Sequence, residues 1–100
     1  MSSTGAQAQV ERRLRKVSQQ LRALRDDLQI TEEQLVQLAD EAEDARIRAL
    51  VSETPGADKE YRKANRHADR LRSSAEKARA RIAELEDQQD DLLDRLSAAT

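Results

Sequence analysis

The sequence predicts an all-α fold in which two long helices form an antiparallel coiled-coil hairpin. Three observations predict it: charged residues make up 38% of the 100 residues, there are only two Gly and one Pro, and apolar residues recur in alternating steps of four and three. Because Cys is absent and Tyr61 is the only aromatic residue, disulfide scaffolds, zinc ribbons and sheets are excluded. We expect a single helical-hairpin domain over residues 1–100.

The first helix is predicted over residues 6–51, after a flexible start at residues 1–5. Thr4 followed by Gln7 matches a capping box, which marks a helix start. A strict heptad pattern then continues to the end of the helix and defines its seam. The seam of the first helix consists of Val10, Leu14, Val17, Leu21, Leu24, Leu28, Thr31, Leu35, Leu38, Ala42, Ala45 and Ala49.

A short turn is predicted at about residues 51–56, with its boundaries drawn at 52–56. This stretch, Ser-Glu-Thr-Pro-Gly, is the strongest punctuation in the chain. Thr54 suits the N-cap of the second helix, because a residue before proline is pushed out of the helical region and proline fits the first helical position.

The second helix is predicted over residues 57–98, with the same heptad rule. Its seam consists of Ala57, Tyr61, Ala64, Ala68, Leu71, Ala75, Ala78, Ile82, Leu85, Gln89, Leu92, Leu96 and Ala99, of which only Gln89 is plainly polar. In the antiparallel register each seam residue faces one seam residue of the other helix, as Leu21 faces Leu85 and Leu38 faces Ala68.

Charge supports the same register. Residues 10–25 carry six basic and one acidic side chain and face 81–96, with two basic and six acidic; residues 26–45 carry eight acids and no base and face 61–80, with seven bases and two acids. A parallel pairing would bring basic blocks together. The register predicts favourable pairs between Arg46 and Asp58, Arg48 and Glu60, Glu32 and Arg72, Asp27 and Arg81, and Glu41 and His67, and unfavourable pairs between Arg25 and Arg79 and between Arg13 and Arg95.

The residue inventory is poor in catalytic groups. With one His and no Cys, most nucleophile, base and metal constellations are excluded, and there is no Gly-rich phosphate-binding loop. We interpret His67 as a polar residue flanking the seam near Glu41, and carboxylate pairs such as Asp40 with Asp44 as solvated faces. We therefore expect no enzyme activity, no cofactor, no metal and no small-molecule substrate.

Protein contacts are the favoured function, as an adaptor, spacer or regulator, with another protein or with a second copy. Ile47, Leu50 and Val51 cluster beside the turn, where they form either a contact site or local packing. The candidate partner contacts are the apolar residues outside the seam: Ile30, Val36, Ile47, Leu50, Val51 and Leu93.

The alternative function is a nucleic-acid-associated or transcription regulator that uses the basic second helix or an acidic tip formed by Glu53, Asp58 and Glu60. The formal net charge of −2 disfavours nucleic acid as a partner. No apolar run is long enough for a membrane span, so we expect a cytoplasmic location. The excess of Arg over Lys, 14 to 4, favours a high-GC bacterial source.

Two families share features with the chain. A hairpin of about this length is similar to the WXG100 secretion substrates, but the turn reads Glu-Thr-Pro-Gly in place of their Trp-x-Gly motif. The segment from Glu60 to Leu85 resembles the second arm of the coiled-coil finger of Gre-type transcript cleavage factors, and that resemblance implies a role for Asp58 and Glu60 as acidic tip residues. The spacing does not match, and we assign no family.

Overall fold

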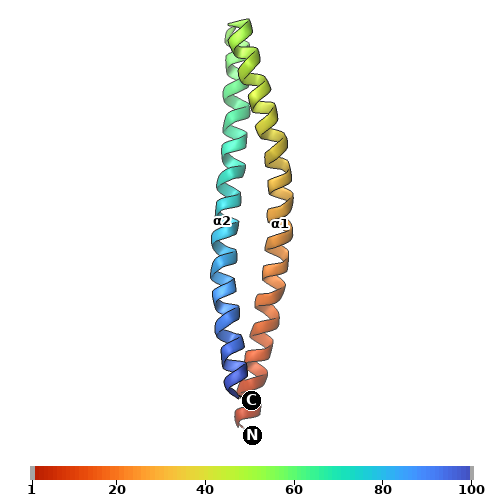
Figure 1. Ribbon diagram of the computed structural model, residues 1–100, viewed down its shortest axis with the longest axis vertical. Coiled ribbons are helices and arrows are strands. Elements are labelled where there is room, and N and C mark those ends of the chain that lie inside the picture. The colour runs from red at the N-terminus through yellow and green to blue at the C-terminus, as the bar shows by residue number, and fades with distance from the viewer. Residues whose placement is uncertain (1, 100) are drawn as a thin grey trace. The chain divides into compact units, whose positions relative to one another are not determined.

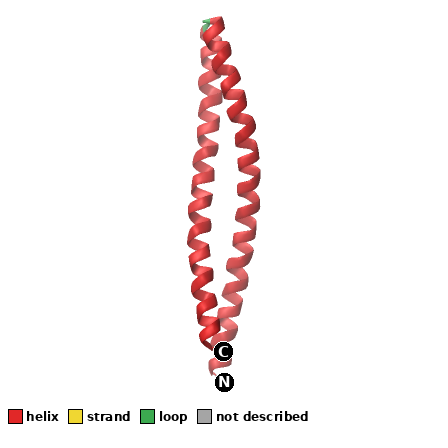
Figure 2. Ribbon diagram, viewed as in Figure 1, coloured by secondary structure: helices red, strands yellow, loops and turns green. Residues whose placement is uncertain are grey.

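The computed structural model describes the backbone of residues 2–99 and the side chains of residues 5–98. Two helices, α1 (Ser2–Ser52) and α2 (Pro55–Ala99), pack against each other as a helical hairpin, as Figures 1 and 2 show. The predicted all-α hairpin is confirmed. It consists of two compact units, which we describe separately: unit 1 combines Met1–Asp27 with Ala78–Thr100, and unit 2 is Leu28–Lys77.

The start of α1 differs from the prediction. The helical backbone already includes Ser2 to Gly5, which the sequence analysis assigned to a flexible start. The capping box of Thr4 and Gln7 predicts the start about three residues later, near Gly5. A single Gly costs a helix only about 1 kcal/mol relative to Ala, and no Pro interrupts this stretch. The helix therefore continues outwards as far as Ser2, and Met1 lies outside the described residues.

The turn contracts to two residues, Glu53 and Thr54, instead of the predicted 52–56. Glu53 adopts a left-handed conformation with φ 53°, and its N–H donates a hydrogen bond of 3.1 Å to the carbonyl oxygen of Ala49, which ends α1. The N–H of Ala57 donates a 3.2 Å hydrogen bond to Thr54 Oγ1, so the predicted N-cap is confirmed. Both helix ends at the turn are thus satisfied locally.

Burial follows the predicted seam in both helices. Every buried or half-buried side chain from residue 57 to residue 96 occupies a seam position of α2, and all twelve seam positions of α1 are buried or half-buried. Between residues 10 and 49 three further side chains, Glu11, Ser18 and Ala39, are half-buried, and all three occupy the same flanking position of the heptad. The heptad pattern therefore located the buried face of each helix.

Unit 1 has a core of branched aliphatic side chains. Leu21 and Leu85, which the register places opposite each other, are each only 1% exposed. Val17, Ile82 and Leu92 complete the buried set of this unit. Because burial of a Leu or Ile side chain stabilises a fold by about 1.5 to 3 kcal/mol, packing in this unit is strongly favourable.

Unit 2 has a core of alanine. The buried residues here are Ala42, Ala45, Ala68 and Ala75, whereas the leucines at seam positions 35, 38 and 71 stay half-buried. The short Ala side chain brings the helix backbones close but removes little apolar surface from water. Unit 2 therefore gains less from burial than unit 1.

Several ion pairs among the described side chains lie within one helix, and they correct part of the predicted pairing. Arg46 binds Glu43 at 2.6 Å and Asp58 binds Arg62 at 3.0 Å, so the predicted pair of Arg46 with Asp58 is wrong. Two further pairs are local, Arg72 with Asp69 and Arg81 with Glu84. Residues three or four apart on one helix are immediate neighbours, so a local partner needs less side-chain ordering than one across the seam.

One ion pair in unit 1 joins the two helices. Arg25, which the register placed against Arg79, instead contacts Glu86 at 3.6 Å. The long guanidinium side chain of Arg25 reaches along α2 to this carboxylate, so Arg25 has an opposite charge beside it where the sequence predicted a like charge.

Candidate protein-contact surface

Three exposed apolar side chains occupy the last turns of α1 in unit 2. Ile47 is 47% exposed, Leu50 64% and Val51 80%. Because Leu50 and Val51 follow Ile47 by three and four residues, all three share one side of the helix. We call these three residues the turn patch. Their exposure favours a contact site over local packing around the turn.

A charged pair borders the turn patch. The Arg46 guanidinium donates two hydrogen bonds to the Glu43 carboxylate, from Nε to Oε2 at 3.0 Å and from Nη2 to Oε1 at 2.6 Å. These hydrogen bonds hold the pKa of the Glu43 carboxyl below its ordinary value and raise the pKa of Arg46. Since Glu43 lies four residues before Ile47, the pair sits on the preceding turn of the same side of α1. The patch is thus apolar with an ordered polar edge.

The other candidate contact residues are isolated. Ile30 and Val36 are 53% and 63% exposed in unit 2, and Leu93 is 44% exposed in unit 1. Val36 lies three helical turns before Ile47, but Asp40 and Glu43 occupy the turns between them. Single exposed apolar residues are common on protein surfaces. Of the six candidate contact residues, the three of the turn patch therefore lie together on one side of α1.

The predicted acidic tip residues have separate surroundings. Glu53 lies in the turn, Asp58 pairs with Arg62 in the first turns of α2, and Glu60 lines a groove with Lys63. All three acids are exposed. Two of the three thus lie beside basic side chains, Asp58 beside Arg62 and Glu60 beside Lys63.

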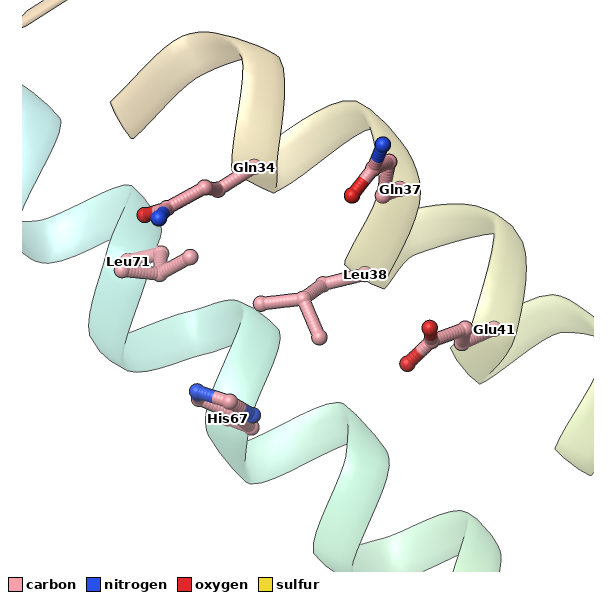
Figure 3. A pocket seen from close by; sticks show the side chains of 6 residues that line it. All are labelled: Gln34, Gln37, Leu38, Glu41, His67 and Leu71. Carbon is pink, nitrogen blue, oxygen red and sulfur yellow. The ribbon is translucent and has the colours of Figure 1, made fainter. Parts of the chain in front are cut away.

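Unit 2 also contains a shallow groove of about 260 Å³ between its two helices. In Figure 3, Leu38 points from α1 towards α2, where Leu71 and His67 line the opposite side. Glu41 and His67 both line this groove, but the favourable pair predicted between them forms no hydrogen bond or ion pair among the described side chains. Gln34 and Gln37 complete the lining.

A second groove of about 240 Å³ shares Leu38, Glu41 and His67 with the first. Neither groove was predicted from the sequence, in which Leu38 and Ala68 were expected only to face each other across the seam. In the structure Ala68 is fully covered, and the larger leucine remains partly exposed beside it. The unequal size of Leu38 and Ala68 was the feature of the sequence that could have predicted the grooves.

Within the part of the chain that the structure describes, no group of three or more His, Asp or Glu side chains could hold a metal ion. Neither α1 nor α2, over the same part, has a stretch long and apolar enough to cross a membrane. No family model matches the chain, and no curated protein or solved structure is similar enough to be matched to it.

Proposed function

We propose that this protein is a non-enzymatic coiled-coil hairpin that acts as an adaptor, spacer or regulator, and that the turn patch binds another protein. The observation that supports this most is the exposure of Leu50 and Val51, 64% and 80%, beside a third exposed apolar residue. Protein interfaces combine an apolar centre with a polar rim, and the pair of Glu43 with Arg46 supplies such a rim. Composition supports a bacterial, cytoplasmic setting.

The test is capture of a partner from the source organism with three baits. The parent chain and the control variant Ile30→Ser should retain the same protein, and the double variant Leu50→Ser with Val51→Ser should lose it. All three substitutions replace exposed apolar side chains of α1, so folding should stay equal, as circular dichroism would verify. Equal capture by the three baits, or no capture by the parent, would contradict the proposal.

A second candidate function is nucleic-acid association through α2. It is favoured by Lys63, Arg66 and Arg70, three exposed basic side chains on one side of that helix. Retention of the parent chain on DNA and RNA columns at increasing salt separates the two functions. The protein-contact function predicts elution well below about 0.15 M salt, whereas phosphate binding by several cations would persist there.

A further inference from the structure

One side of unit 2 leaves the seam between α1 and α2 open. The two grooves of about 260 and 240 Å³ adjoin there, since they share Leu38, Glu41 and His67. We call the surface that these two grooves line the groove face. Leu38 and Leu71 occupy seam positions but are only half-buried, and Leu38 reaches from α1 towards Leu71 and His67 on α2 (Figure 3). The groove face thus exposes leucine side chains that a second pair of helices would cover.

A small residue makes the groove face accessible to a neighbouring helix. Ala64 lines the second groove and is half-buried, and the distance between packed helices depends on the side chains at their contact. A side chain as short as alanine therefore lets another helix approach closely at this point.

The wall that α1 contributes to the groove face is mainly acidic. Glu41 lines both grooves, and Asp44 lies on the same side of α1, one heptad after the groove residue Gln37. Arg48 follows Glu41 by one heptad and is the basic residue of this wall nearest the turn. The three charged side chains are exposed, and none of them has an ion pair or hydrogen bond among the described residues.

The wall that α2 contributes is mainly basic. Glu60 is its residue nearest the turn, and Lys63 and Arg70 follow with His67 between them, all four lining the second groove. These side chains are also exposed and have no ion pair or hydrogen bond among the described residues. The order of charges away from the turn is therefore acid then base on α2, the reverse of the order on α1.

We propose that the groove face binds the groove face of a second copy of this chain, about a two-fold axis parallel to the helices, so that unit 2 of both copies forms a four-helix bundle. Such a rotation keeps each residue at its level and places α1 of one copy over α2 of the other. In the antiparallel register Asp44 and Lys63 share nearly one level, as do Arg48 and Glu60. Asp44 of each copy then lies opposite Lys63 of the other, and Arg48 opposite Glu60.

Charge complementarity selects this occupant and this orientation. A two-fold axis perpendicular to the helices would place α1 over α1, where like charges would meet because residues 28–45 contain six acids and no base. A nucleic acid would be attracted by the wall of α2 and repelled by the wall of α1. A second copy offers the same leucines together with both walls in matching order. No residue of the turn patch is required, so the dimer can fail or hold separately from the proposed function.

Sedimentation equilibrium measures the association. The mass of the parent chain should rise from 11.3 kDa towards twice that value between about 1 and 100 μM. A parent that stays at 11.3 kDa throughout overturns the proposal and leaves the groove face to a helix of another protein.

An exchange of charges tests the pairing without changing the net charge. One variant carries Asp44→Lys and Arg48→Glu, and a second carries Glu60→Lys and Lys63→Glu. For each variant alone the dissociation constant of the dimer should rise at least about tenfold, because like charges then meet at both positions. An equimolar mixture should associate like the parent, since a mixed dimer restores opposite charges on both of its sides. That recovery also shows that the variants are folded, and its absence overturns the proposal.

The matched control carries Asp69→Arg and Arg72→Asp, which reverses an exposed ion pair of α2 outside the groove face and also keeps the net charge. It should associate like the parent. A control that dissociates as readily as the first two variants would place the contact elsewhere on unit 2 and overturn the proposal.

A distance between copies tests the orientation. A spin label at Ser52, the exposed last residue of α1, should lie within about 25 Å of the label on the other copy, because the parallel axis brings equal levels together. An axis perpendicular to the helices at the level of Leu38 would separate the labels by about 40 Å, at roughly 1.5 Å per residue. A measured distance of about 40 Å would therefore overturn the proposed dimer.

Discussion

Gln89 Nε2 donates a hydrogen bond of 3.1 Å to Ser18 Oγ across the interface of α1 and α2 in unit 1. Gln89 is the plainly polar residue of the seam, and Ser18 is one of the few half-buried residues outside it. The hydrogen bond to Gln89 therefore explains the partial burial of Ser18, which the heptad pattern does not predict. Each polar side chain satisfies the other at the edge of an aliphatic core.

A double-mutant cycle should measure this hydrogen bond. Gln89→Ala and Ser18→Ala, separately and together, are expected to show a coupling free energy of about 0.5 to 1.5 kcal/mol in chemical denaturation. Additive effects of the two substitutions would mean that the hydrogen bond contributes nothing to the stability of unit 1.

The register of unit 1 predicts a short distance between Gln20 and Gln88. The two residues line one shallow groove, and both side chains are exposed, so spin labels there should not disturb the core. Electron–electron distance measurements on dilute monomer should give less than about 15 Å, since packed helix axes lie roughly 8 to 10 Å apart. A distance of tens of ångströms would exclude the antiparallel register.

Glu53→Gly should stabilise the hairpin. Glu53 has a positive φ, a conformation that costs a residue with a Cβ about 1 to 2 kcal/mol and costs glycine nothing. Against this, the greater backbone freedom of glycine stabilises the unfolded chain by about 0.4 to 1 kcal/mol. We expect a net gain of up to about 1.6 kcal/mol in the free energy of unfolding. The control Ser52→Gly, within α1, should lower stability by roughly 0.5 to 1 kcal/mol. Equal effects at the two positions would contradict the assignment of the helix end.

The two cores predict different rates of local opening. Backbone amides near Ala42, Ala45 and Ala68 in unit 2 should exchange with solvent at least about tenfold faster than those near Leu21 and Leu85 in unit 1. The reason is the smaller apolar area that alanine removes from water, at about 0.8 kcal/mol per methylene. Hydrogen exchange followed by mass spectrometry is the measurement, and uniform protection along the chain would contradict this difference.

The exposed apolar residues of the candidate surface could be found in the sequence, because Ile47, Leu50 and Val51 fall outside the heptad seam. Whether these side chains are exposed could not be predicted from the sequence, since the same residues allow either burial around the turn or exposure. In the structure all three side chains are exposed, and the turn beside them is closed by hydrogen bonds from the backbone N–H groups of Glu53 and Ala57 that involve none of these side chains.

The sequence by itself determined the two helices, the turn between them and the buried face of each helix. These features depend on local chemistry: the heptad spacing selects one side of a helix, and Thr54 before Pro55 interrupts it. Tertiary structure alone decided which seam residues are fully buried and with which residues the charged side chains form ion pairs. Ala68 is fully covered while Leu38 is only half-buried, and Arg25 contacts Glu86, because side-chain reach and backbone separation at each layer depend on both helices together.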